Sequence, residues 1–236
     1  MGSPGGKGAL REQVRASRRA GPAADPRALA DRCLHYLRSL PGPLRVTCYS
    51  SYGTEPETSA LLDSLVAAGY EVLLPRVEGD DLAWIPHGEP LAVPRTEVVD
   101  PATQVAKRGG SADPTATQVA KRGGSADPTA TRIAEPAGDP VALLPLRAML
   151  VPALAAAIDG ARLGKGGGYY DRVLATLHDV PADARPAVVA LVRDEDVLPA
   201  GSIPMEPHDQ RVDVVITPTR VARCESPSGR RSRPDG

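Results

Sequence analysis

Residues 45–76 read Arg-Val-Thr-Cys-Tyr-Ser-Ser-Tyr-Gly-Thr-Glu-Pro-Glu-Thr-Ser-Ala-Leu-Leu-Asp-Ser-Leu-Val-Ala-Ala-Gly-Tyr-Glu-Val-Leu-Leu-Pro-Arg. Two apolar runs flank a segment in which Leu61, Leu62 and Leu65 recur at the spacing of one helix face. This pattern predicts a strand over 45–51, a helix over 57–68 and a strand over 70–76. A strand–helix–strand succession is typical of a parallel sheet.

Similar patterns extend this unit in both directions along the chain. Toward the N-terminus, a basic helix is predicted over 9–20 and a second helix follows Asp25-Pro26, an N-cap and first-turn pair, until it meets the Pro-Gly-Pro at 41–43. Buried strands are predicted over 149–158, 186–192 and 212–217, a helix over 169–177, and short strands over 82–85 and 91–93. The fold class predicted is α/β: a Rossmann-like, open, mainly parallel sheet with helices on both faces.

With 236 residues, of which 42% are hydrophobic, the chain can bury one sizeable core. We therefore expect a single α/β domain over residues 1–221. Residues 102–117 recur identically as 116–131, a tandem 14-residue unit that predicts a flexible surface insertion over 101–131. The basic residues after 221 predict a disordered tail over 222–236; contact with nucleic acid is the alternative, but no aromatic residue interleaves the charges and we expect none.

The cysteines and the hydropathy pattern bear on location. The three cysteines are odd in number and widely spaced, so they predict neither a disulfide framework nor a metal site. No N-terminal apolar segment or apolar stretch of roughly 18 residues occurs, so neither a signal peptide nor a membrane span is expected. A cytoplasmic, monomeric protein is predicted.

The segment from Arg162 to Asp171, Arg-Leu-Gly-Lys-Gly-Gly-Gly-Tyr-Tyr-Asp, joins a predicted strand to a predicted helix. Glycines without Cβ let backbone N–H groups approach an anion, and the free N–H groups of a helix's first turn add partial positive charge. The cations of Arg162 and Lys165 flank the glycines. The segment thus predicts a phosphate-binding turn, and a glycine-rich connection without a ligand is the plainer alternative.

Two better-known glycine motifs fail here. A Walker A loop has the pattern Gly-x-x-x-x-Gly-Lys-Ser/Thr, but Gly160 and Gly164 are too close together and Gly166 follows Lys165, so the magnesium-binding hydroxyl is missing. A dinucleotide fingerprint that starts at Gly164 needs glycine at 169, where Tyr169 stands. A nicotinamide-dependent oxidoreductase is therefore disfavoured.

Three acidic residues are candidate partners of this turn. Asp171 and Asp209 offer the carboxylate oxygens that Mg²⁺ uses when it also holds phosphate, although helix-capping or turn roles are equally open to them. Glu55 follows the first predicted strand, at the edge where doubly wound sheets bind ligands, and a capping box of Thr54 with Glu57 does not account for it. The four histidines, His35, His87, His178 and His208, show no ligand spacing, and core or surface roles are expected for them.

The stretch Arg162–Arg172, preceded by Leu150-Val-Pro-Ala-Leu, resembles the signature of the 5-formyltetrahydrofolate cyclo-ligase family, also called 5,10-methenyltetrahydrofolate synthetases. Further elements occur in family order, and all but residues 1–6, the repeat and the tail are covered. These elements are Lys7-x-x-x-Arg11, the Tyr-x-x-x-x-Glu-x-x-Thr that ends at Thr58, Leu73-Leu-Pro-Arg76, and His208-Asp-x-x-Val-Asp213 with Thr217-Pro218.

The resemblance implies an ATP- and Mg²⁺-dependent ligase that closes 5-formyltetrahydrofolate to 5,10-methenyltetrahydrofolate and releases ADP and phosphate. It implies that Asp171 and Asp209 hold Mg²⁺, that Glu55 hydrogen-bonds the pterin, and that Tyr169 or Tyr170 lines the folate site beside the transferred phosphate. Arg162, Lys165, Tyr169 and Tyr170 are the implied catalytic residues. The implied ATP-binding residues are Lys7, Arg11, Arg162, Leu163, Gly164, Lys165, Gly166, Gly167, Gly168, Tyr169, Tyr170 and Asp171.

Two positions depart from the family pattern. Some relatives carry a second cation where Gly167 stands, and the aromatic residue that commonly precedes the Gly-Ile-x-Glu-Pro element is absent from Thr131-Arg-Ile-Ala-Glu-Pro136. A non-catalytic relative that binds nucleotide or folate is the alternative function. The joint presence of Lys7, Arg11, Arg162, Asp171 and Asp209 favours the enzyme.

Overall fold

The structure is a computed structural model, and it describes residues 6–21, 24–78, 81–88 and 143–225. Apart from Gly88, these residues belong to one compact unit formed by 1–87 and 135–236. Its helices are α1 (Lys7–Ala20), α2 (Pro26–Arg38), α3 (Ser59–Ala67) and α4 (Tyr169–Ala175), with 3-10 turns η3 (Thr176–Asp179) and η4 (Asp194–Asp196). Its strands are β1 (Arg45–Thr47), β2 (Glu71–Glu78), β3 (Asp81–Pro86), β4 (Ala148–Pro152), β5 (Ala155–Ala157), β6 (Arg162–Leu163), β7 (Ala187–Leu191), β8 (Val197–Leu198), β9 (Val214–Ile216) and β10 (Val221–Arg223).

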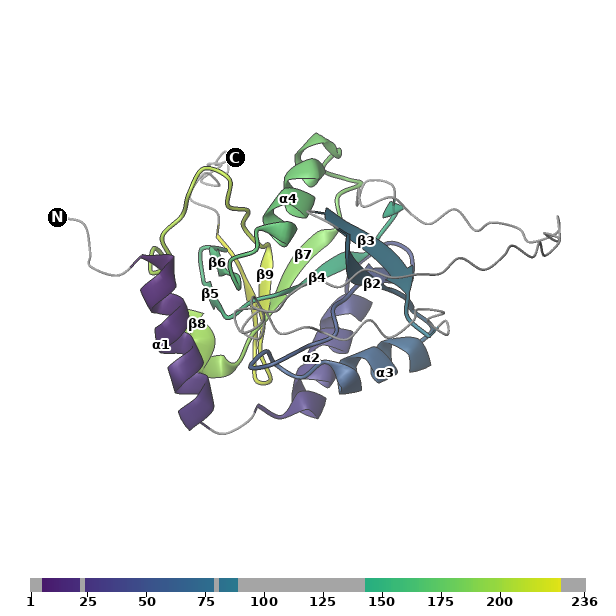
Figure 1. Cartoon of the computed structure of the whole chain (residues 1–236). Helices are drawn as coiled ribbons and strands as arrows, with labels where there is room; N and C mark the ends of the chain where they lie inside the picture. Colours follow the sequence, from purple (N-terminus) through teal and green to yellow (C-terminus); the bar gives the residue numbers. More distant parts are fainter. Residues whose placement is uncertain (1–5, 22–23, 79–80, 89–142, 226–236) are drawn as a thin grey trace, which may run out of the picture. The chain divides into compact units, whose positions relative to one another are not determined.

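The main sheet has seven strands in the order β10-β9-β7-β4-β1-β2-β3 (Figure 1). The five inner strands pair in parallel, and the edge strands β3 and β10 pair antiparallel. Val46 of β1 lies opposite Val72 of β2 on one side and Ala148 of β4 on the other. The chain therefore winds outward in opposite directions from β1 and β4, and this reversal marks the crevice where open α/β sheets bind ligands.

Helices cover both faces of this sheet, as predicted. Successive side chains of a strand point to opposite faces, so a fully buried strand is apolar at every position. In β4, Leu150 packs in the core beneath α2 and α3, whereas Met149 and Val151 pack with α4 on the other face. The predicted α/β class with a mainly parallel sheet is confirmed.

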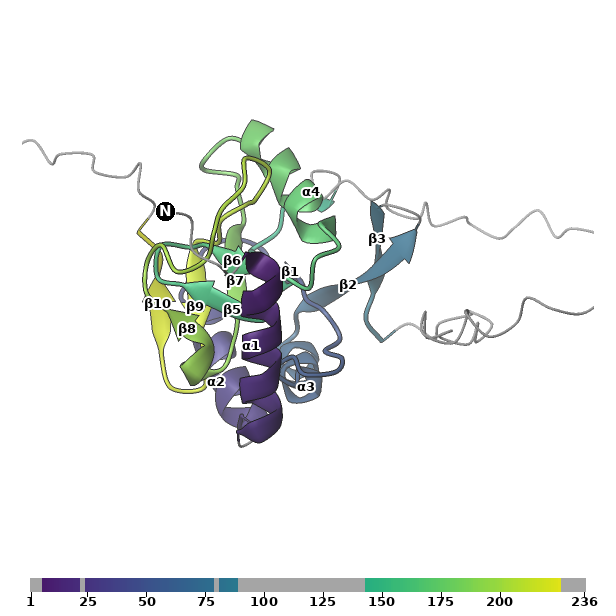
Figure 2. The ribbon, with the colours of Figure 1, turned by 60° about the vertical axis from the view of Figure 1, so that its left-hand side comes forward.

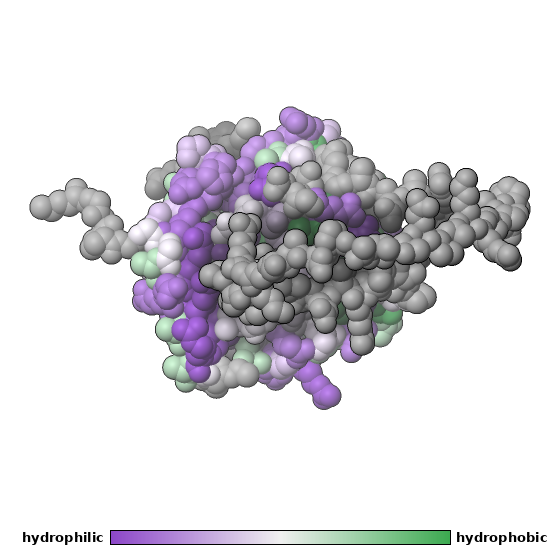
Figure 3. Space-filling view, in the orientation of Figure 1, coloured by the Kyte–Doolittle hydropathy of each residue, from purple (hydrophilic) through white to green (hydrophobic). Residues whose placement is uncertain are grey.

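The prediction of one continuous strand over 149–158 was wrong, because the segment is interrupted at Ala153 and Leu154. The first part is β4 of the main sheet, and the second is β5 of a separate three-stranded sheet in the order β6-β5-β8. Figure 2 shows α1 lying across this small sheet, and Val14 of α1 is buried against it. The opposite side of α1 is exposed, and hydrophilic residues dominate the surface there (Figure 3).

The boundaries of several other elements can be compared with the predictions. Asp25 caps α2 through hydrogen bonds from the backbone N–H groups of Arg27 (2.9 Å) and Ala28 (3.4 Å), as predicted. The capping box at Thr54 is wrong: α3 begins at Ser59, and Glu57 accepts a hydrogen bond from the Ser59 N–H. The expected start of the tail at residue 222 lies inside β10.

Some predictions lie outside the described residues: the short strand over 91–93, the repeat insertion over 101–131, the element at 131–136 and the tail from residue 226 onward. Among the helices that the structure does describe, none combines the length and the apolar character needed to cross a membrane.

Candidate functional site

A cavity of about 280 Å³ opens beyond the carboxyl ends of β1 and β4, at the reversal of strand order. Tyr49, Ser50 and Tyr52 reach it from the loop after β1, and Pro152, Ala153 and Leu154 reach it from the break after β4. The predicted residues Lys7, Arg11, Glu55, Arg162, Gly164, Lys165, Gly166, Gly167, Gly168, Tyr169, Tyr170, Asp171 and Asp209 all line it. Leu163 does not, because its side chain is fully buried in the core between α1 and the small sheet.

Among the described residues, three of the four cations that line the cavity are paired with its three carboxylates. The ammonium group of Lys7 contacts the carboxylate of Asp209, Arg162 Nη2 lies 2.9 Å from Asp171 Oδ1, and Lys165 Nζ lies 2.9 Å from Glu55 Oε1. Burial by itself raises the pKa of Asp209. The hydrogen bonds from Lys7 and from the Glu206 N–H lower it by more than burial raises it, so the pKa lies below its usual value. The cavity thus holds its charges close together with little net excess.

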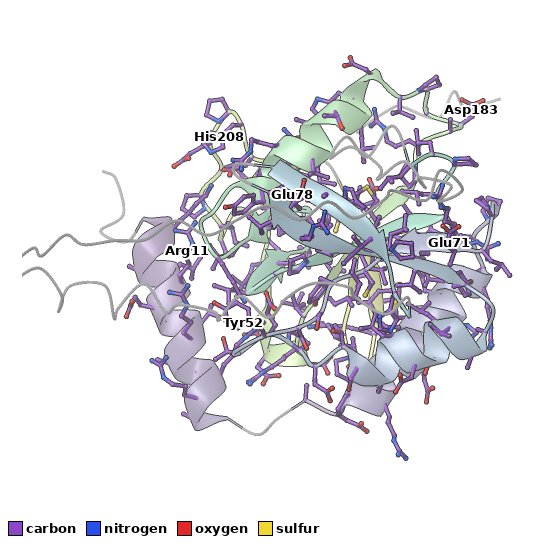
Figure 4. All side chains as sticks on the ribbon, turned by 45° about the vertical axis from the view of Figure 1, so that its right-hand side comes forward. Arg11, Tyr52, Glu71, Glu78, Asp183 and His208 are labelled. Carbon is purple, nitrogen blue, oxygen red and sulfur yellow. The ribbon has the colours of Figure 1, made fainter. Side chains whose placement is uncertain are left out.

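These groups come from four segments far apart in the sequence: α1, the loop after β1, the segment from β6 to α4, and the loop before β9. Figure 4 shows Arg11 of α1, Tyr52 of the loop after β1 and His208 of the loop before β9 on one side of the sheet in that view. Glu71, at the start of β2, and Asp183, before β7, lie on the opposite side. Parallel strands place their carboxyl ends at one edge, and this arrangement collects the site residues there.

The glycine segment forms a tight turn between β6 and α4. Gly166 and Gly168 have φ values of 112° and 68°, a backbone conformation that residues with a Cβ rarely adopt. Gly167 has no such backbone conformation, but a Cβ there would lie 2.9 Å from the ring of Tyr169, so a side chain at this position would force the ring to move. Arg11 Nε donates to the Gly164 carbonyl oxygen at 2.9 Å, so this arginine is held against the turn.

The match with known proteins extends over most of the chain. The family model of 5-formyltetrahydrofolate cyclo-ligases matches residues 5–218. The chain belongs to the 5-formyltetrahydrofolate cyclo-ligase family. A relative from Mycolicibacterium smegmatis, named 5-formyltetrahydrofolate cyclo-ligase, is 37% identical over 225 residues, which cover 92% of this chain and 96% of the relative.

Two solved structures share the fold. The NMR structure of Aquifex aeolicus 5,10-methenyltetrahydrofolate synthetase has a TM-score of 0.58 at 23% identity and covers 92% of each chain. The structure of a 5,10-methenyltetrahydrofolate synthetase from Mycoplasma pneumoniae has a TM-score of 0.56 at 17% identity and covers 89% of this chain and 97% of that one. The family resemblance indicated by the motifs is confirmed.

The sequence did not indicate that Arg18 helps to build the site of this cyclo-ligase family member. Its guanidinium group, on the same helix as Lys7 and Arg11, is 1% exposed and its Nε donates to Asp196 Oδ2 at 2.8 Å. Its Nη atoms donate to the carbonyl oxygens of Thr54 and of Leu154, the latter at 2.6 Å. Arg18 therefore ties α1 to the loop after β1 and to the break between β4 and β5, both of which contribute residues to the cavity. Only its position on the same helix face as Val14 hinted at burial.

The loop after β1 also contributes more than predicted. Tyr52 is 75% exposed at the cavity, and Lys165 Nζ lies 3.6 Å from the centroid of its ring. Burial is the main cause that raises the pKa of Tyr49 well above its usual value, and the neighbouring Cys48 and Glu55 raise it further. Burial likewise raises the pKa of Tyr170. Both phenols are therefore protonated at neutral pH.

The two aspartates predicted to hold Mg²⁺ both line the cavity. Asp171 Oδ1 accepts a hydrogen bond of 3.1 Å from the Gln210 N–H, so the segment that carries Asp209 lies beside Asp171. Asp209 also belongs to a second group with Glu206 and His208, in which one potential metal-ligand atom of each residue lies within 4.8 Å of the others. The sequence spacing of the histidines did not indicate that His208 would be part of such a group. The Glu206 and His208 side chains are exposed. Mg²⁺ prefers oxygen ligands, so the carboxylates of Asp171 and Asp209 on the cavity wall suit it better than a group that includes an imidazole nitrogen.

The cysteines have no disulfide partners, as predicted for Cys33, Cys48 and Cys224. Burial raises the pKa of Cys48 to about 12 and that of Cys224 to about 11. Because the thiolate is the reactive form, these thiols are inert at neutral pH.

Proposed function

We propose that this chain catalyses the ATP- and Mg²⁺-dependent cyclisation of 5-formyltetrahydrofolate to 5,10-methenyltetrahydrofolate, with release of ADP and phosphate, as a monomer in the cytoplasm. The observation that carries the proposal is the convergence of four cations, three carboxylates and a glycine turn on one cavity of a family member. Phosphoryl transfer needs this combination, since its catalysis rests on positioning and on the stabilisation of charge.

In the proposed reaction the formamide oxygen of the substrate attacks the γ-phosphorus of ATP, and ADP leaves. N10 of the same folate then attacks the activated formyl carbon and loses its proton, and the C–O bond breaks as inorganic phosphate leaves. Phosphorylation converts a poor leaving group into a good one. The protein's task is to align the two reactants, to exclude water and to offset the charge of the phosphates.

The residues of the cavity fit both ligands. Lys7, Arg11, Arg162 and Lys165, with the backbone from Gly164 to Gly168, would bind the phosphates, and the absence of Cβ atoms lets an anion come close to the turn. Asp171 and Asp209 would hold Mg²⁺, which would supply positive charge to offset the negative charge of the phosphates. Glu55 would bind the pterin, with Tyr169 and Tyr170 beside the transferred phosphate.

The existing ion pairs give a reason for coupled binding of nucleotide and metal. Lys7 and Arg162 now pair with Asp209 and Asp171. If a bound phosphate drew these two cations away, the aspartates would lose their partners, and a bound Mg²⁺ would offset their charge instead. Uncompensated carboxylates at partly buried positions are costly, so metal and nucleotide are expected to bind together. Equilibrium binding of ATP with and without Mg²⁺ measures this coupling.

The decisive experiment mixes the purified protein with 5-formyltetrahydrofolate and Mg-ATP and follows the absorbance of the methenyl product. Omission of ATP and the variant Asp171→Asn are the controls, and the variant is expected to lose turnover while it keeps the fold. Absence of ATP-dependent product would overturn the proposal. Binding of nucleotide or folate without turnover would instead support a non-catalytic relative.

A further inference from the structure

Two buried phenol groups at the cavity have no hydrogen-bond partner among the described residues. The Oη atoms of Tyr49 and Tyr170 are both shielded from solvent, and both residues line the cavity. Tyr49 follows β1 and is 3% exposed, whereas Tyr170 is the second residue of α4. A buried hydroxyl without a partner is costly, so native proteins rarely leave one unsatisfied.

The surroundings of Tyr49 define the chemistry of that ligand. The Glu55 side chain, 5% exposed, is fixed by Lys165 at 2.9 Å and by a hydrogen bond of 3.0 Å from the Tyr52 N–H. The Thr58 hydroxyl donates to the Tyr49 carbonyl oxygen at 2.9 Å and fixes the backbone of Tyr49 in the same loop. This corner therefore offers a carboxylate, which accepts hydrogen bonds, beside a protonated phenol, which donates one.

A pterin ring presents the complementary set along one edge: an amino group and a ring N–H, which donate, next to a ring carbonyl, which accepts. We infer that Tyr49 donates a hydrogen bond from Oη to the ring carbonyl of the folate while Glu55 accepts from the neighbouring N–H groups. Tyr49 is then a substrate-recognition residue. Tyr170 also lies near Glu55, whose charge helps to raise the pKa of Tyr170 after burial, but the Arg162 guanidinium lies 5.8 Å from its ring centroid beside the glycine turn. The inference rests on the proposed function.

The variant Tyr49→Phe tests this role, because it removes one oxygen and keeps the ring. The KM for 5-formyltetrahydrofolate is expected to rise about 5- to 30-fold, while the KM for ATP stays within about twofold. The matched control is Tyr36→Phe, a buried tyrosine of α2 outside this cavity, which should change neither constant. The melting temperature of the ligand-free Tyr49→Phe protein should be unchanged or higher, because the substitution removes a hydroxyl that makes no hydrogen bond in the ligand-free protein.

A second measurement identifies the group that Tyr49 contacts. Calorimetry without ATP compares the binding of 5-formyltetrahydrofolate with that of its 4-amino analogue, in which an amino group replaces the ring carbonyl. The wild-type protein should prefer the carbonyl form, and Tyr49→Phe should reduce this preference at least about fivefold. An unchanged preference, an unchanged folate KM in an active enzyme, or a melting temperature several degrees lower would each overturn the inference. A wild-type protein that neither binds nor converts 5-formyltetrahydrofolate would overturn the proposed function as well.

Discussion

Lys7 and Asp209 form an ion pair that joins α1 to the loop before β9, although 202 residues separate them in the chain. The Lys7 and Asp209 side chains are only 13% and 9% exposed, so solvent screens the pair weakly. The pair places the first basic residue of α1 and one proposed metal ligand on the same wall of the cavity. The N-terminal helix is therefore part of the site itself.

The lowered pKa of Asp209 predicts how this pair depends on pH. A carboxylate whose pKa is lower in the folded than in the unfolded state stabilises the fold at pH values above the unfolded pKa, about 3.9 for aspartate. This contribution disappears as the pH falls through the folded pKa. Lys7→Met should therefore lower the free energy of unfolding at neutral pH, and its difference from wild type should shrink below about pH 4. Urea unfolding across this range measures it. A difference that stays constant into the acid range would contradict the assignment.

A side chain at Gly167 should misplace the Tyr169 ring, although Gly167 does not adopt a positive φ as Gly166 and Gly168 do. In Gly167→Ala the new Cβ would displace the Tyr169 ring, which also faces the Arg172 guanidinium at 5.0 Å. We expect kcat/KM to fall roughly 10- to 100-fold with little change in melting temperature, because the misplaced group lies at the site. Gly8→Ala is the control: apart from its chain neighbours and the backbone of its own helix, no atom lies within 4 Å of the position that its methyl group would take, and alanine favours the helix. Equal activity of the two variants would show that the ring is not needed in its place.

Arg18 should be needed for both stability and activity. Arg18→Met leaves the Asp196 carboxylate with Arg193 alone and removes the donors to Thr54 and Leu154, so a loss of about 3–5 kcal/mol in the free energy of unfolding is expected. Under conditions where the variant is still folded, the KM for ATP should rise, because α1 carries Lys7 and Arg11. Arg19→Met, on the exposed face of the same helix, should behave as wild type. Chemical denaturation and steady-state kinetics test the two effects separately.

The sequence predicted the parts of the fold that depend on local pattern. Asp25-Pro26 began a helix where it should, and the leucines of 57–68 placed α3, because caps and helical periodicity are local signals. The break of the apolar run at Ala153 and Leu154 had no such signal. A run buried on both faces shows no periodicity, and the pairing of β5 with β8 depends on residues some 40 positions away.

The residues of the candidate site also fall into those that the sequence indicated and those that it did not. Glycines, cations and carboxylates in family order located the cavity residues. Leu163, which the family resemblance also implied, has its side chain in the core instead. Arg18 was missed because a charged residue of a basic helix is usually solvated, and only long-range partners reveal its burial. Tyr49 was missed because a tyrosine at the end of a strand is ordinarily a core residue.

Lys165 and Glu55 provide the last prediction, because their ion pair joins the proposed nucleotide and folate parts of the cavity. Lys165→Met should raise the KM for ATP about 10- to 100-fold, since it removes a charged hydrogen-bond donor to phosphate. Glu55→Gln should raise the KM for 5-formyltetrahydrofolate by a similar factor and leave the KM for ATP nearly unchanged, because the amide keeps the shape and loses one acceptor. The double variant then measures the coupling between the two groups by steady-state kinetics. If both single variants altered the same KM, the two residues would serve one ligand, and the division of the cavity proposed above would be wrong.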